Sequence, residues 1–262
     1  MILQESEMGD NIINELKNCI ESSDKSIKSL QRVFFEISKK MMSECVFKVK
    51  DVEFELTEIE FYYYREGYHE DESIHKDELQ KVAGKLYVHN TSIDRGGIDI
   101  TFGDTESYGG ILIRGMKIDD KFVAGPSKVK NKLSKALVGC CLEYQDLQEL
   151  FNKNPLLINE KGSTNHNPYI STRVGLGESH NSDFGYALYR FIREDYMNES
   201  KGEFENENKG NLREISRAKA ITFFAMDRYF NEKPELSKVE NNKDLMKNIK
   251  DFRDEKDHSC ND

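Results

Sequence analysis

The sequence predicts an α+β fold: a single domain in which a curved antiparallel β-sheet is flanked by helices and extended by helical segments at both ends. Three observations predict it. Apolar residues recur at helical spacing before residue 45, alternate with polar residues from residue 46, and then fall in short runs between Gly-rich turns. We expect a helical N-terminal segment over 1–45, a core domain over 46–195, and a linker with a charged helical extension over 196–262.

The first half of the chain gives the clearest helix and strand signals. Apolar side chains recur along 12–20 and again along 30–41, and a polar break near 22–24 divides them into one or two helices. From 46 to 64 the pattern changes to alternation, which predicts a half-buried strand.

Short strands and helices follow, separated by turns such as Tyr108-Gly109-Gly110. Strands are expected over 85–89, 98–102, 111–114 and 122–124, with a later pair over 170–174 and 186–193. Helices are expected from about residue 127 to 141, over 147–151 and over 212–230, with a linker over 198–210 and a charged helix or tail at the end.

The composition is that of a chain able to bury a sizeable core. The 262 residues are 10% aromatic and 33% charged, with a net charge of -10. No stretch approaches the roughly 18 consecutive apolar residues of a membrane span, and the first ten residues do not resemble a signal peptide. The cysteines form no CxxC pair and have no paired His spacing for zinc. We therefore expect a cytoplasmic protein with no membrane and no metal partner.

Two acids stand where alternation predicts apolar side chains. If the pattern from Val52 to Leu56 continues, Glu58, Glu60 and Tyr62 lie on the same face of their strand. Carboxylates there are costly unless they are paired or functional, and a buried carboxylate suits general acid or base work. The alternative is a register shift or bulge that turns both acids to solvent, and periodicity leaves both open.

One stretch of this acidic chain is basic. Between residues 121 and 135 there are five lysines and no acid. Lys128, Lys130 and Lys132 are the candidates for phosphate contacts in this stretch. An ordinary solvated helix face would give the same pattern.

Six short segments occur in an order and spacing that one enzyme family shares. They are Glu58-Ile59-Glu60-Phe61-Tyr62, the acidic turn that leads to His75, Gly84-Lys85-Leu86-Tyr87-Val88, Ile111-Leu112-Ile113-Arg114, Gly125-Pro126-Ser127-Lys128-Val129 and Arg173-Val174-Gly175-Leu176-Gly177. In these segments the chain resembles the alkyladenine (3-methyladenine) DNA glycosylases of the mammalian type, over roughly residues 30 to 195.

The resemblance implies an enzyme that flips a nucleotide out of a duplex and hydrolyses its N-glycosidic bond. Glu60 would be the base that activates water, and Arg114 would hold that water or the carboxylate. Tyr62 and His75 would border the flipped base, and His89 falls where the family carries another stacking aromatic. No lysine is implicated as a nucleophile, so the family implies a monofunctional DNA N-glycosylase, with DNA as its partner and no cofactor.

Two positions depart from the family pattern. Ser92 stands where the family has a Tyr that wedges into the duplex, and a serine cannot fill the space of an extruded base. Asp99 stands where the family has an Asn that screens bases at the pocket floor, and its charge would change which base is tolerated. Two alternatives stay open: a binding module that kept the fold and contacts nucleic acid, or a protein through its terminal helices, and an N-glycosidase that acts on nucleosides or RNA.

Overall fold

A computed structural model of the chain describes residues 6–89, 96–164, 167–176, 183–197, 221–237 and 242–259. The chain divides into two compact units, Met1–His166 and Asn167–Asp262. The domain limits expected from the sequence, after residues 45 and 195, stay predictions.

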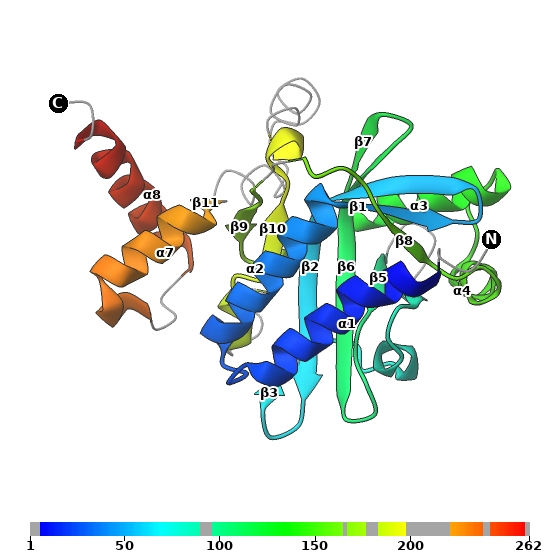
Figure 1. Cartoon of the computed structure of the whole chain (residues 1–262), viewed down its shortest axis with the longest axis horizontal. Helices are drawn as coiled ribbons and strands as arrows, with labels where there is room; N and C mark the ends of the chain where they lie inside the picture. The colour runs from blue at the N-terminus through cyan, green and yellow to red at the C-terminus, as the bar shows by residue number, and fades with distance from the viewer. Residues whose placement is uncertain are drawn as a thin grey trace. The chain divides into compact units, whose positions relative to one another are not determined.

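Two helices open the first unit. They are α1 (Ser6–Ser22) and α2 (Ile27–Ser43), and the Ser26 side chain caps α2 by accepting a hydrogen bond from the Ser29 amide. In Figure 1, α1 passes in front of the long strands β2 and β6. The Phe34 ring of α2 stacks on the Phe61 ring of β2, with centroids 4.3 Å apart. The face of the sheet that carries Phe61 is therefore the face that packs on α2.

The sheet of the first unit is antiparallel. Its centre is the pair β2 (Val52–Arg65) and β6 (Ser107–Ile118), and β5 (Ile98–Thr101) and β4 (Leu86–Val88) follow outward from β6. Shorter strands complete it: β1 (Cys45–Val49) pairs with β2 and with β8 (Leu157–Glu160), β3 (His69–Glu70) with the end of β2, and β7 (Lys121–Ala124) with β6. The expected strand over 46–64 is therefore two strands, joined at a tight turn where Lys50 has a φ of 52°.

A β-bulge interrupts β2 at Thr57. Leu56 pairs with Met116 and Glu58 pairs with Gly115, so β2 advances by two residues while β6 advances by one. Residues directly opposite each other share a face of the sheet, and neighbours along a strand do not. Glu58 therefore lies on the face opposite to Leu56.

After the bulge, side chains on both faces of β2 are buried. Ile59 and Phe61 lie on the face that packs on α2, whereas Glu58 and Glu60 lie on the other face, where they are 2% and 0% exposed. The expectation that both acids continue the apolar face of Leu56 is therefore wrong, because the extra residue reverses the alternation. The alternative was correct about a bulge, but the acids turn to a second buried face and not to solvent.

The Gly109-Gly110 pair lies inside β6 and not in a turn, contrary to expectation. A Cβ atom at Gly109 would lie 2.6 Å from the Phe102 ring, and one at Gly110 would lie 2.7 Å from Oδ2 of Asp99. The pair therefore serves close packing on both faces of the strand. The turn that the sequence suggested here comes just before the strand.

Two further helices belong to the first unit. α3 (Pro126–Val138) begins with proline, ends at Gly139 with a φ of 82°, and buries Val129 and Leu133. α4 (Tyr144–Lys153) covers the edge strand β4, because the Gln148 side chain accepts a hydrogen bond from the Val88 amide and donates one to the Leu86 carbonyl. A short 3-10 helix, η1 (Glu78–Lys81), precedes β4.

The second unit joins a small antiparallel sheet to a helix pair. Its strands are β9 (Tyr169–Ser171), β10 (Arg190–Ile192) and β11 (Ile221–Thr222), with β9 between the other two. The remaining elements are η2 (Asp183–Tyr186), α7 (Phe223–Glu232), η3 (Pro234–Ser237) and α8 (Asn242–Ser259). The rings of Tyr229 and Phe252, 5.3 Å apart, join α7 to α8.

The predicted α+β class with an antiparallel sheet is confirmed. The expected linker over 198–210 and the first part of the expected helix over 212–230 lie outside the described residues, and α7 begins only at Phe223. Within the described part of the chain, no helix combines the length and apolar character needed to cross a membrane.

Candidate active site

The centre of the site is a buried group of charges on β2 and β6. Arg114 is an extra residue of β6 at the irregular register, and its guanidinium contacts two carboxylates: Nε donates to Glu58 at 3.1 Å and an Nη atom donates to Glu60 at 3.3 Å. The Tyr62 hydroxyl donates to the same Glu60 oxygen at 2.9 Å. The structure thus brings together three residues that the sequence singled out, Glu60, Arg114 and Tyr62.

The three charged side chains, Glu58, Glu60 and Arg114, lie almost entirely out of contact with water. Arg114 is 8% exposed. Burial alone lowers the pKa of its guanidinium, but the charges of Glu60 and then Glu58 outweigh burial and raise it. The guanidinium therefore stays positive at every physiological pH.

Asp99 is the anchor of a second polar cluster. It lies on β5 and is 2% exposed; one carboxylate oxygen lies 2.8 Å from Nε2 of His89, and the other accepts a hydrogen bond of 3.1 Å from the Gln80 amide. Burial alone would lower the pKa of His89, but the charge of Asp99 and its hydrogen bond together raise it above its ordinary value of 6.5. The pair is an Asp-oriented imidazole that favours the protonated form.

His75 continues this cluster toward solvent. Its ring lies 4.5 Å from the His89 ring, centroid to centroid, and its Nδ1 is 3.2 Å from the Tyr87 hydroxyl. Burial lowers the pKa of His75, and the charge of His89 lowers it further. Burial also raises the pKa of Tyr87, so this hydroxyl stays protonated. Two neighbouring imidazoles are thus biased in opposite directions.

The two clusters lie on the same face of the sheet. Leu112 of β6 pairs with Glu60 on one side and with Asp99 on the other. Two strand spacings separate the Glu60 and Asp99 backbones, roughly 10 Å. Leu112 stands between the two clusters and is 7% exposed.

The lysine stretch does not form the basic face that the sequence suggested. Lys128 is exposed, but Lys130 is 1% exposed, and Lys132 pairs with Asp119 at 3.3 Å. Lys130 does not lie on the surface, because its position in α3 faces the interior, and its contact with phosphate stays a prediction. Its positive charge acts on His89 in the direction of a lower pKa. Ser92 lies outside the described residues.

Two residues of the second cluster were missed in the sequence. Gln80 accepts a hydrogen bond from the Asp77 amide, and Asp77 in turn accepts one from the Leu79 amide, which makes a capping box. The Asp-x-x-Gln spacing is a visible signal for that box. Gln80 also contacts Asp99, and no sequence pattern predicts this contact because the two residues lie in different segments of the chain. In the sequence, Tyr87 stands out only as part of the segment Gly84-Lys85-Leu86-Tyr87-Val88.

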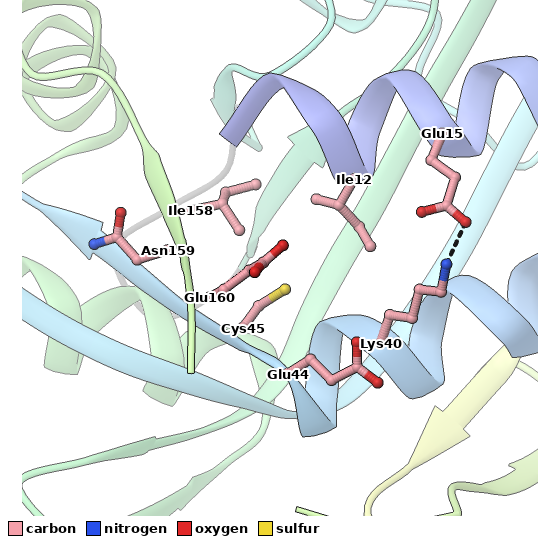
Figure 2. Close-up of a pocket in the computed structure, with 8 residues that line it drawn as sticks. All are labelled: Ile12, Glu15, Lys40, Glu44, Cys45, Ile158, Asn159 and Glu160. Carbon is pink, nitrogen blue, oxygen red and sulfur yellow. Dashed lines mark hydrogen bonds and ion pairs between the residues drawn. The ribbon is translucent and has the colours of Figure 1, made fainter. Parts of the chain in front are cut away.

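A pocket of about 250 Å³ lies elsewhere in the first unit, between α1, α2, β1 and β8. Its lining is Ile12, Glu15, Lys40, Glu44, Cys45, Ile158, Asn159 and Glu160 (Figure 2). Glu15 and Lys40 form an ion pair between the two helices. Burial, with the charges of Glu44 and Glu160, raises the pKa of the Cys45 thiol to about 12, so this thiol is a poor nucleophile. None of the predicted site residues lines this pocket.

In the described residues, no group of three or more His, Cys, Asp or Glu side chains has an arrangement that could hold a metal ion. No known family model matches the chain, and no curated protein does either. The likeness to the alkyladenine glycosylases therefore stays a prediction that rests on the motifs of the sequence.

Proposed function

We propose that the protein is a monofunctional DNA N-glycosylase that hydrolyses the N-glycosidic bond of a flipped, modified base. The observation that carries the proposal is the contact of Glu60 with Arg114 and Tyr62 on one buried face of the sheet. The family resemblance assigns Glu60 and Arg114 to catalysis and Tyr62 to contact with the flipped base. Arg114 supplies a positive charge beside the Glu60 carboxylate, the group that would accept the proton of the attacking water.

Each group has a role in the proposed reaction. Glu60 removes a proton from the attacking water, and Arg114 orients the carboxylate through its contact with the Oε2 atom. Tyr62 donates to that oxygen as well and so helps to hold the carboxylate. Because Glu60 is 0% exposed, a nucleotide reaches it only after covering side chains move aside.

The decisive experiment is Glu60→Gln, tested for base release from DNA duplexes that carry alkylated, deaminated or bulky bases. We expect wild-type protein to leave abasic sites in at least one duplex and the variant to lose this activity by a factor on the order of 100 or more. Glu53→Gln is the matched control, since Glu53 lies on the same strand with its side chain 57% exposed. Wild-type protein that is inert on the whole panel would contradict the proposal. Nucleosides and RNA in the panel test the N-glycosidase alternative.

The full burial of Glu60 favours one alternative, a binding module whose polar cluster serves the fold. In that case Glu60→Gln changes stability and leaves nucleic-acid or protein binding unaltered. Equilibrium unfolding of the same variant, measured beside its activity, separates the two functions.

A further inference from the structure

The pocket between α1, α2, β1 and β8 has no part in the proposed glycosylase reaction. Its volume of about 250 Å³ is below the roughly 300–1,000 Å³ that is typical of sites for drug-sized ligands. At about 30 Å³ for each molecule of liquid water, this volume corresponds to roughly eight waters. The pocket therefore suits a ligand of a few non-hydrogen atoms and is too small for a nucleotide.

Negative charge predominates in the lining of this pocket. Among the eight lining residues Lys40 is the one base, and it forms an ion pair with Glu15 between the two helices. Glu44 and Glu160 stay available, because neither side chain forms an ion pair or a hydrogen bond with another described residue. Three carboxylates thus stand against one ammonium group, and this excess attracts a cationic ligand.

Strand pairing places one of these acids beside a buried thiol. Cys45 of β1 lies directly opposite Glu160 of β8, so both side chains leave the same face of the strand pair. In Figure 2 both side chains are turned toward α1. Cys45 is 5% exposed, and its thiol forms no hydrogen bond with another described residue. A neutral thiol packs like a small apolar group, so it leaves the carboxylate as the group that binds a charge.

Two isoleucines give the pocket an apolar wall. Ile12 of α1 is 8% exposed and Ile158 of β8 is 4% exposed. Such a wall contributes nothing to the binding of a bare metal ion, and among the described residues no group of three or more His, Cys, Asp or Glu side chains is arranged to hold one. An ammonium group on a short hydrocarbon chain matches both the carboxylates and the isoleucines.

We propose that this pocket binds a primary alkylammonium group with a chain of about four carbons. The ammonium group contacts the carboxylates of Glu44 and Glu160. The hydrocarbon chain packs against Cys45, Ile12 and Ile158. A free amine and the lysine side chain of another protein share this chemistry. The site is separate from the buried charges of β2 and β6, so it does not depend on the proposed base release.

The test is a titration of the ¹⁵N-labelled full chain with butylammonium chloride, followed by NMR, with sodium chloride holding the ionic strength constant. We expect saturable shifts at the amides of Cys45, Ile158 and Glu160. The uncharged 1-butanol has the same carbon chain and should bind at least about tenfold more weakly. Nα-acetyl-lysine methylamide distinguishes the two sources: tighter binding than butylammonium assigns the site to a protein lysine, and weaker binding assigns it to a free amine.

Three variants and a matched control locate the binding. Glu160→Gln removes a charge at an exposed position and should weaken butylammonium binding by about fivefold. Glu36→Gln removes the same charge from an exposed position of α2 outside the pocket and should leave the affinity unchanged. Cys45→Met extends a side chain into the pocket and should abolish binding, whereas Cys45→Ala should retain it. Thermal melting shows whether each variant is folded, and Glu160→Gln decides the test if Cys45→Met does not fold.

Several results would overturn this site. They are shifts that do not saturate, equal binding of 1-butanol and butylammonium, and equal affinities in Glu160→Gln and Glu36→Gln. Butylammonium binding that persists in folded Cys45→Met would place the amine elsewhere and overturn it as well. None of these measurements uses DNA, so failure of the amine site and failure of the glycosylase function are distinguishable.

Discussion

At the scale of single residues, the site depends on how buried charges are matched. Arg114 contacts both Glu58 and Glu60, and all three side chains are nearly excluded from solvent. A buried ion pair adds little net stability compared with an apolar core, but the loss of one partner leaves an uncompensated charge in a medium of low polarity. Removal of one partner alone should therefore lower the free energy of unfolding strongly.

We expect Arg114→Met to lower the free energy of unfolding by about 3–5 kcal/mol, because methionine keeps the apolar stem and removes the charge from two buried carboxylates. Urea unfolding measures the change. The control is Lys153→Met, whose partner Glu149 is four residues away on the surface of α4. An exposed pair of that kind contributes little to stability, so this variant should unfold almost like the wild type. Similar losses in both variants would show that the central charges are not isolated from water.

The opposite biases of His75 and His89 predict opposite pH dependences. The pKa of His89 is raised in the folded protein, so its stabilising contribution is complete below about 6.5 and is lost as the pH rises through the folded value. The pKa of His75 is lowered, so its contribution is present above about 6.5 and is lost as the pH falls through its folded value.

We therefore expect the destabilisation caused by His89→Gln to be larger at acidic than at alkaline pH, and that caused by His75→Gln to be larger at alkaline than at acidic pH. Urea unfolding of both variants and the wild type across this range measures the two trends. Parallel curves for the two variants would contradict the arrangement in which only His89 is held by Asp99.

At the scale of secondary-structure elements, the bulge at Thr57 decides where the acids point. Thr57 is buried, and its hydroxyl finds no hydrogen-bond partner among the described residues. An unsatisfied buried hydroxyl destabilises the fold, and valine has nearly the same shape without that group.

We expect Thr57→Val to raise the free energy of unfolding by about 1 kcal/mol. Thr101→Val, on strand β5 of the same sheet, is the matched control, because the Thr101 hydroxyl donates to the Val82 carbonyl and accepts from the Lys85 amide. That variant should be destabilised by about 1–3 kcal/mol. Destabilisation in both variants would indicate that the Thr57 hydroxyl is paired in solution.

The same element shows what the sequence could and could not predict. Helical spacing and alternation located α2, β2, β5 and α3, because these patterns are local. The reversal of faces at Thr57 depends on how β2 pairs with β6, so alternation alone assigned Glu60 to the wrong side. The pairing of Glu60 with Arg114 came from the family resemblance, whereas the contact between His89 and Asp99 came from neither source. That contact needs the register of β4 and β5, which periodicity does not specify.

At the scale of the whole molecule, charge limits how DNA can bind. The net charge is -10 and the isoelectric point is about 5.3, so phosphate contacts must come from a few local cations. Of the three lysines that the sequence proposed, Lys128 is exposed, Lys130 is buried and Lys132 is paired with Asp119. Long-range attraction of the chain to DNA is therefore weak.

We expect a shallow salt dependence of DNA affinity, with a slope of log K against log salt of roughly -2 to -3, since each neutralised phosphate contributes about -0.9. Lys128→Gln should make that slope shallower by about one unit. Lys130→Gln should instead lower stability and leave the slope of the folded protein unchanged. Fluorescence anisotropy of a labelled duplex between about 50 and 200 mM salt measures both. A steep slope that Lys128→Gln does not alter would place the phosphate contacts on a different surface, because Lys130 is buried and Lys132 is paired with Asp119.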